Sequence, residues 1–344
     1  MSLPGDEHIV RKMPSGRRTN LALGILLLTA VLSGLASNTI GVDWPLDLAT
    51  MHGVLALGIV FLGPWKSLVI RRGLRRQRKG NWTSLVLLGL TLTALLSGVL
   101  HTTGLTTHLG PLSVMQVHVG AAVIALAMAI QHFVRHPVPP RATDLNRRAL
   151  LRATVLVSGA GMAWLGWQRT LHAIGWPGAN RRFTGSHERG SGNPHALPVT
   201  SWFDDRIPDI DRDDWRVDIG GERASLTSIT DRPQERFDAL LDCTGGWYSV
   251  QTWEGVSLEN LLEAGDWRSF EVRSATGYSL LFPMRDLGRV YLVTAMGGEP
   301  LSPGHGFPAR VVAPGRRGFW WVKWVVSIQP SMRPWWLQPP LPLT

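Results

Sequence analysis

The stretch at residues 241–262 reads LDCTGGWYSVQTWEGVSLENLL, and it contains Cys243, the single cysteine of the 344-residue chain. A lone cysteine cannot form an internal disulfide, so its thiol packs in a core, bridges to another chain, acts as a nucleophile or ligates a soft metal. A free cysteine also behaves as a small hydrophobe, which makes packing the simplest alternative. The rest of the sequence has to decide between these uses.

The net charge of +10 and the pI near 10.8 would normally suggest a nucleic-acid partner. The distribution of charge argues against it, because residues 1–152 hold 16 Lys and Arg against 5 Asp and Glu, whereas the remainder holds 19 against 20. The basic excess therefore belongs to the N-terminal half, and we expect no nucleic acid.

The N-terminal half contains apolar runs of the length that crosses a bilayer as a helix. They predict an all-α transmembrane bundle over residues 20–170, after a cytoplasmic tail at 1–19, with spans near 20–37, 48–70, 82–104, 112–134 and 150–168. Buried core helices of a soluble protein are the alternative. The chain is thus predicted to be a multi-domain membrane protein.

Lys and Arg near the spans alternate as the positive-inside rule requires. They gather before the first span, after the second and before the fifth: Arg11, Lys12, Arg17, Arg18; Lys66, Arg71, Arg72, Arg75, Arg76, Arg78, Lys79; Arg135, Arg141, Arg147, Arg148, Arg152. The links 38–47 and 102–111 carry none. We therefore expect a multi-pass cell-membrane protein with a cytoplasmic N-terminus and an extracytoplasmic C-terminal domain.

The fifth span begins with Asn146-Arg147-Arg148-Ala149-Leu150-Leu151-Arg152. This pattern resembles a twin-arginine export signal, which would deliver the following domain already folded around a bulky cofactor. The alternative is that the paired arginines only obey the positive-inside rule.

Histidines inside the spans are functional hypotheses because buried ionisable groups are costly in a membrane. His52, His101 and His118 fall at a similar outer depth, whereas His132 follows His118 by 14 residues, about 21 Å along a helix. Histidines that only join helices by hydrogen bonds are the alternative.

The second and fourth spans contain MHGVLALG and VHVGAAVIALAMAIQH, and they resemble the haem-binding helices of small bacterial membrane b-type cytochromes. The resemblance implies one haem b with His52 and His118 as axial ligands, and Gly53 and Gly120 beside them would admit the flat porphyrin. His101 is the rival ligand, or a partner for a propionate or a quinone. Lys66 stands where a second haem would need a histidine.

A linker is predicted at 171–197, and from about Ala179 the composition shifts to Gly, Pro, Asp, Arg and Trp. We expect residues 181–198 to be irregular and at the surface. Short strands are predicted near 215, 269, 289, 309 and 320, with helices at LTSIT and VSLENLLEAG. Strands and short helices without a βαβ period indicate an α+β domain over 198–329, followed by a tail at 330–344.

Four segments of this domain, in order, are DCTGGW, VSLENLLEAG, MGGEPLSPGHGFPARVVAPG and WVKWVVSI. Together they resemble the molybdopterin-dependent oxidoreductases of the sulfite oxidase fold. The resemblance implies that Cys243 is the catalytic thiolate ligand of molybdenum. It also places His305, Arg310 and Lys323 at positions that bind the molybdopterin, whose phosphate requires cations.

Two further residues are weaker candidates for cofactor binding. Arg317, with Arg316, belongs either to the cofactor site or to a solvated turn. His195 resembles a family histidine near the cofactor and is equally well explained as a linker residue. Lys323, inside an aromatic and apolar strand, needs a partner for its charge.

The turn after Cys243 reads Thr244-Gly245-Gly246-Trp247, without the Asn and Arg of true sulfite oxidases, and it looks more like the bacterial branch of the periplasmic methionine sulfoxide reductase. We therefore expect reduction of a small S- or N-oxide, with electrons exchanged through the haem with a quinone or another respiratory carrier. A sulfite-type dehydrogenase and a non-catalytic subunit of a respiratory complex are the alternatives. The short C-terminus suggests a monomer, or one subunit of a membrane complex, and Trp335 and Trp336 either enter the membrane interface or pack in the core.

Overall fold

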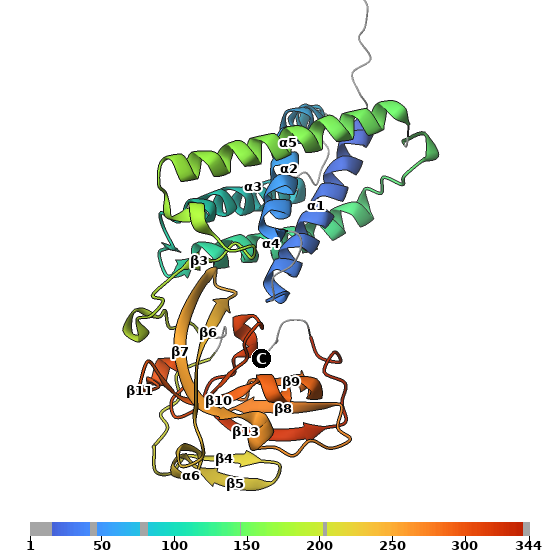
Figure 1. Cartoon of the computed structure of the whole chain (residues 1–344). Helices are drawn as coiled ribbons and strands as arrows, with labels where there is room; N and C mark the ends of the chain where they lie inside the picture. Colours follow the sequence, from blue (N-terminus) through green and yellow to red (C-terminus); the bar gives the residue numbers. More distant parts are fainter. Residues whose placement is uncertain (1–15, 42–46, 76–81, 145, 202–204, 340–344) are drawn as a thin grey trace, which may run out of the picture. The chain divides into compact units, whose positions relative to one another are not determined.

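The computed structural model describes residues 16–41, 47–75, 82–144, 146–201 and 205–339. The chain divides into two compact units, the first made of residues 1–33, 50–99 and 117–174 and the second of residues 34–49, 100–116 and 175–344. The second unit therefore contains several helix ends as well as the C-terminal half. Figure 1 shows the elements along the chain.

The first unit is built from five helices: α1 (Gly16–Thr39), α2 (Leu48–Arg75), α3 (Trp82–Thr103), α4 (Val114–Arg135) and α5 (Arg147–Ala173). One end of each of α1 to α4 belongs to the second unit, whereas α5 lies wholly in the first. Each predicted span coincides with one of these helices. Among the described residues, these five are long and apolar enough to cross a membrane. Of the basic residues that suggested the topology, Arg11, Lys12, Arg76, Arg78 and Lys79 lie outside the described residues, as does most of the tail at 1–19.

Polar side chains define the ends of two of these helices. The side chain of Asn146 accepts a hydrogen bond from Ala149 N at 2.9 Å, so α5 starts at the first of the paired arginines. Arg17, at the start of α1, donates to both carboxylate oxygens of Asp144 at 2.6 and 2.8 Å, and this pair joins α1 to the turn before α5.

The second unit contains two main sheets and a small hairpin of β1 (His108–Leu109) and β2 (Leu112–Ser113). One main sheet has the order β11-β10-β7-β3, and in addition β6 pairs with β7 and β12 pairs with β10. Its strands are β3 (His187–Glu188), β6 (Glu235–Cys243), β7 (Trp247–Ser257), β10 (Tyr291–Met296), β11 (Glu299–Pro300) and β12 (Arg310–Val312). The other has the order β5-β4-β13-β8-β9: β4 (Arg216–Ile219), β5 (Glu222–Ser225), β8 (Ser269–Ser274), β9 (Ser279–Pro283), β13 (Val325–Ser331). With α6 (Leu226–Thr230) as a short helix, this is the expected mixture of strands and short helices.

The core between the sheets is aromatic and aliphatic. Phe270 and Phe282 are fully buried with their rings stacked, and Trp253 and Trp321 meet edge to face. Trp335 packs against this core, whereas Trp336 is exposed. Core packing is therefore the better description of Trp335.

The five predicted strands are present as β4, β8, β10, β12 and β13, but two predictions about this half were wrong. VSLENLLEAG does not form a full helix, because β7 continues to Ser257 and only a single 3-10 turn, Leu258–Asn260, follows. The strand expected to contain Lys323 begins only at Val325, after Trp324 with its positive φ of 51°. The pairing of β6 with β7 was not predicted.

The segment expected to be a surface linker is also different. The loop at residues 182–187, called the linker loop below, is closed by a hydrogen bond from Arg182 N to Ser186 O at 3.0 Å. Thr184, Ser186 and His187 are buried, and β3 at its end pairs with β7. The linker loop therefore packs inside the second unit and does not lie on its surface, where its composition had predicted it.

Gly255, in the middle of β7, lies against the backbone of β10, where a Cβ atom would come within 2.3 Å of Leu292 O. We predict that Gly255→Ala lowers the thermal unfolding midpoint by roughly 2 to 12 °C, because the two strands have to separate locally. Gly89→Ala is the matched control, since no atom outside its own helix lies within 4 Å of that Cβ position in α3. An unchanged midpoint for Gly255→Ala in a circular-dichroism melt would contradict this packing.

Candidate functional site

Cys243 is the last residue of β6, and a tight turn connects it to β7. In the register of this hairpin Cys243 pairs with Trp247, and Gly246 N donates to Cys243 O at 3.1 Å. Gly246 has a φ of 90°, which an L side chain rarely adopts. Gly245 N lies 3.3 Å from Cys243 Sγ and donates to it, so the turn presents the sulfur with one backbone donor.

Cys243 lines a small cavity. Its lining combines cationic, aromatic and small residues: Pro198, Thr200, Leu241, Cys243, Trp247, Gly304, His305, Arg310, Gly318, Trp321 and Lys323. Four residues that the sequence singled out, Cys243, His305, Arg310 and Lys323, are therefore brought together from segments up to 80 residues apart.

Arg310 begins β12 and is only 3% exposed. Its guanidinium donates to His305 O and Trp321 O, both at 3.1 Å, and lies over the rings of Trp253 and Trp321. Its Nε is buried without a hydrogen-bond partner in the described structure.

Lys323 and His305 are held by uncharged groups. Lys323 Nζ donates to Thr200 O at 3.0 Å, Ser201 Oγ at 3.1 Å and Gly304 O at 2.9 Å. The ring nitrogens of His305 lie 2.8 Å from Ser302 Oγ and 3.2 Å from Leu197 O. Neither residue has a carboxylate within hydrogen-bonding distance among its described contacts.

Burial and mutual repulsion lower the pKa values of these cations. The pKa of Lys323 falls to about 7, because of burial first and the nearby Arg310 second, and burial lowers the pKa of Arg310 to about 9. Burial and Arg310 also lower the pKa of His305. Burial raises the pKa of the Cys243 thiol; the Gly245 N–H and then Arg317 oppose this rise, whereas Asp242 adds to it.

These residues fit an anionic cofactor that also carries a metal. Arg310 is buried and Lys323 is partly buried, and neither donates to a carboxylate among its described hydrogen bonds, which favours an added anion such as a phosphate. The unsatisfied Nε of Arg310 leaves a donor for it. The only thiol of the chain faces the same cavity, and thiolates are soft metal ligands. No group of three or more His, Cys, Asp or Glu in the described ranges could hold a metal by itself, so a metal here depends on ligands from the cofactor.

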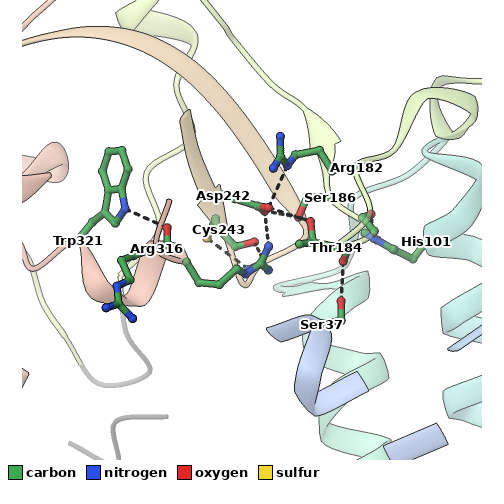
Figure 2. A network of polar contacts seen from close by, with 12 residues as sticks. Ser37, His101, Arg182, Thr184, Ser186, Asp242, Cys243, Arg316 and Trp321 are labelled. Atoms are coloured by element: carbon green, nitrogen blue, oxygen red, sulfur yellow. Dashed lines mark hydrogen bonds and ion pairs between the residues drawn. The ribbon is translucent and has the colours of Figure 1, made fainter. Parts of the chain in front are cut away.

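Arg317 has a different environment from the one expected, since it is 2% exposed and the solvated-turn interpretation is therefore wrong. It forms a buried ion pair with Asp242, and its Nη2 donates to Cys243 O at 3.2 Å. It does not line the cavity. Figure 2 shows Asp242 at the centre of a polar network beside Cys243.

Three donors of the linker loop converge on the same carboxylate. Asp242 accepts hydrogen bonds from Thr184 Oγ1 at 2.8 Å, Ser186 Oγ at 2.6 Å and Arg182 Nε at 3.2 Å. The sequence interpretation missed these residues. The available signal was an acidic residue directly before the cysteine, inside an apolar strand where a charge requires partners.

Of the other residues that the sequence singled out in this domain, His195 and Arg316 do not line the cavity, whereas Trp247 does. The side chain of His195 is 80% exposed and lies 3.5 Å from Glu299, so the structure does not bring it to the site. Arg316 pairs with Asp286 and stacks on Trp320. Trp247 lines the cavity and donates from Nε1 to Thr200 Oγ1 at 3.2 Å.

In the first unit, the rings of His52 and His118 lie nearly perpendicular to each other, with their centroids 5.8 Å apart. Nδ1 of His52 lies 3.0 Å from Ala30 O, and Nδ1 of His118 lies 2.8 Å from Ala94 O. A carbonyl can only accept, so both Nδ1 atoms carry the proton and both Nε2 atoms keep a lone pair for a metal. This donor set fits a bis-histidine haem.

Two details of the haem prediction change. Gly53 does not leave an open face, because a Cβ there would lie 2.3 Å from the ring of Trp164, whereas Gly120 has no atom within 4 Å of that position. His101 belongs to the second unit, where its Nε2 lies 3.1 Å from Gly185 O and its ring contacts that of His187 at 4.7 Å between centroids.

Comparison with known proteins bears on the second unit. Residues 204–336 match the model of the oxidoreductase molybdopterin binding domain. Nitrate reductase [NADH] 1 of Phaseolus vulgaris is 31% identical over 169 residues, covering 36% of this chain and 19% of that protein. The mitochondrial sulfite oxidase of Homo sapiens is 28% identical over 168 residues, covering 36% of this chain and 31% of that protein. The crystal structure of the sulfane dehydrogenase SoxCD from Paracoccus pantotrophus aligns with a TM-score of 0.35 and 22% identity, covering 37% and 40% of the two chains.

Residues 204–336 therefore match a molybdopterin-binding oxidoreductase domain and are similar to parts of nitrate reductase and sulfite oxidase, so the matches indicate an oxidoreductase. The chain spans less than a third of the length of either curated relative.

Lys323 gives a test of the cation cluster. Its pKa of about 7 lies below the value of about 10.4 expected when unfolded, so the unfolded chain binds more protons between these values and stability rises with pH. We predict that the cofactor-free protein, made in a host that lacks the pterin pathway, gains thermal stability between pH 7 and 8.5. Lys323→Met should show a smaller rise in the same scans, and equal rises in both proteins would contradict the buried charge.

Proposed function

We propose that the chain is a membrane-anchored molybdenum oxidoreductase that reduces a small extracytoplasmic S- or N-oxide with electrons from a quinol, delivered through one haem b. The observation that carries the proposal is the convergence of Cys243, His305, Arg310 and Lys323 on one cavity. This arrangement supplies a metal ligand and an anion site together, as the domain match requires.

The reaction balances with the components named. An S-oxide that takes up two electrons and two protons gives a sulfide and water, and a quinol oxidised to a quinone supplies both. When bound, the molybdenum cofactor provides the two-electron oxygen-atom chemistry.

The chain's own residues supply ligation, binding and orientation. Cys243 provides the thiolate, which Gly245 N orients by its hydrogen bond to the sulfur. Arg310, Lys323 and His305 would compensate the negative charge of a pterin phosphate, and Arg310 would offer its free Nε to it. Trp247 and Trp321 give the cavity aromatic walls that favour a neutral organic substrate over an inorganic oxyanion.

The helical half is assigned to electron exchange with the membrane. Five apolar helices and the placement of Lys and Arg in the sequence support a cytoplasmic N-terminus and an extracytoplasmic molybdenum domain. Arg147 and Arg148, exposed at the start of α5, support export of this domain by a twin-arginine route. A haem between His52 and His118 would supply one-electron transfer, and a second haem is not proposed because Lys66 donates to Asn20 where another ligand would be needed.

A sulfite-type dehydrogenase that feeds electrons to the membrane is the second candidate. The match to mitochondrial sulfite oxidase favours it. The uncharged turn Thr244–Trp247 disfavours it, since no arginine there could bind an anionic substrate. Assays of purified protein with sulfite and an electron acceptor, and with a sulfoxide and reduced quinol, separate the two directions.

Metal and pigment analysis tests the proposal. We predict about one molybdenum per chain in the wild type, and a changed Mo(V) electron paramagnetic resonance signal in Cys243→Ser, since a hydroxyl replaces a soft thiolate ligand. Thr244→Ser, in the same turn, should keep the wild-type signal. Molybdenum-free wild-type protein would overturn the catalytic assignment, and an unchanged Mo(V) signal in Cys243→Ser would overturn the ligand.

The haem has its own test. We predict that His52→Leu and His118→Leu each abolish the reduced b-type absorption bands of the membrane-extracted protein, because each removes one axial ligand. His108→Leu, an exposed histidine in β1, should leave the bands unchanged. Absence of such bands from the wild type would refute the electron route while leaving the molybdenum site intact.

A further inference from the structure

Asp242 is a buried carboxylate that neither lines the cavity nor faces solvent. It is 1% exposed, forms an ion pair with Arg317, and accepts hydrogen bonds from the side chains of Arg182, Thr184 and Ser186. A buried charge with this many donors is costly to assemble. Its location next to the thiol that ligates the metal suggests a role beyond stability.

The Asp242–Arg317 pair controls the backbone of the thiol-bearing residue. Arg317 Nη2 donates to Cys243 O at 3.2 Å, so the arginine joins the carboxylate to the peptide of Cys243. The following residue, Gly318, is packed so tightly that a Cβ would lie 3.1 Å from Cys243 Cα. Asp242 thus holds Arg317 in position, and Arg317 in turn holds the backbone of Cys243.

The linker loop fixes the carboxylate from the other side (Figure 2). While its side chains donate to Asp242, three successive carbonyls of the loop accept hydrogen bonds from helix ends within the second unit. Phe183 O accepts from Ala49 N at 3.0 Å, Thr184 O from Ser37 Oγ at 2.9 Å, and Gly185 O lies 3.1 Å from His101 Nε2. The donors to Asp242 are therefore held on a loop that is itself anchored.

We propose that Asp242 is a positioning residue for the molybdenum site, and that its charge, balanced by Arg317 and by the hydroxyls of the linker loop, sets the reduction potential of the metal bound to Cys243. A negative charge near a redox centre disfavours the more negative, reduced state, and in a buried site this effect is weakly screened. Each hydroxyl that donates to the carboxylate partly cancels its field. This inference rests on the proposed molybdenum cofactor and on neither the haem, the membrane nor the substrate.

The test is a mediated redox titration of the purified, metal-loaded protein, in which electron paramagnetic resonance follows the Mo(V) signal. Asp242→Asn removes the negative charge and leaves Arg317 uncompensated, so the molybdenum potential rises and the Mo(V) line shape changes. Ser186→Ala and Thr184→Val keep every charge but remove a donor to the carboxylate, so the potential falls. Shifts of opposite sign in the two kinds of variant are the expected result.

Asp238→Asn is the matched control, because Asp238 lies on the same strand, is exposed, and binds Thr252 Oγ1 at 2.6 Å. It should leave the potential and the line shape unchanged, and a shift like that of Asp242→Asn would overturn a specific role. If Asp242→Asn fails to load metal, the two neutral variants decide: a lowered potential supports the role and an unchanged one overturns it. Loaded variants with the wild-type potential refute this inference alone, whereas a wild type without molybdenum refutes the proposed function and this inference together.

Discussion

Compensation of buried charge is the constraint on which the second unit depends. Two kinds of buried charge meet at the turn of Cys243. Asp242 and Arg317 form a buried ion pair whose carboxylate also accepts hydrogen bonds from two hydroxyls and a second arginine. The two charges are therefore balanced within the described residues, although Arg317 Nε has no hydrogen-bond partner among them. Arg310 and Lys323 have only carbonyls, a hydroxyl and aromatic faces among their described contacts, and their pKa values are lowered accordingly. The charges of Asp242 and Arg317 compensate each other and belong to the structural part of the site. The charges of Arg310 and Lys323 are not compensated by a bonded carboxylate, so these two residues belong to the part that would bind a ligand.

The features carried by local pattern could be predicted from the sequence. Five apolar runs predicted five helices, because length and hydropathy are local properties. Four residues of the cavity, Cys243, His305, Arg310 and Lys323, were predicted because each lies in a recognisable segment. Nothing local revealed that Ser186 would meet Asp242, because the contact joins positions 56 residues apart and the intervening chain reads as a linker.

The errors have a similar physical cause. VSLENLLEAG has a helical pattern of leucines, yet Val256 and Leu258 are buried as parts of a strand and of the turn after it, so sheet pairing overrode local propensity. Gly53 looked like space for a cofactor, whereas Trp164 from a helix more than 100 residues later fills it. His195 lies in a suggestive position in sequence and at the surface in space. In each case a long-range contact determined the outcome.

The two glycines of the Thr244–Trp247 turn show how closely such contacts define the site. Gly245 brings its N–H to the sulfur, and a Cβ there would come within 3.4 Å of the same atom, so a side chain would compete for the space of a metal. Gly246 meets a different limit, because its φ is 90° and a Cβ would lie 2.7 Å from the ring of His101, at the end of α3. His187 N donates to Gly246 O, and His187 Nε2 lies 2.8 Å from His101 O. His187, at the end of the linker loop, therefore connects the turn to the end of α3. The conformation of the turn that carries the thiol therefore depends on contacts with the C-terminal end of α3 as well as on its own strands. A displacement of this helix end relative to the hairpin would move the backbone next to Cys243.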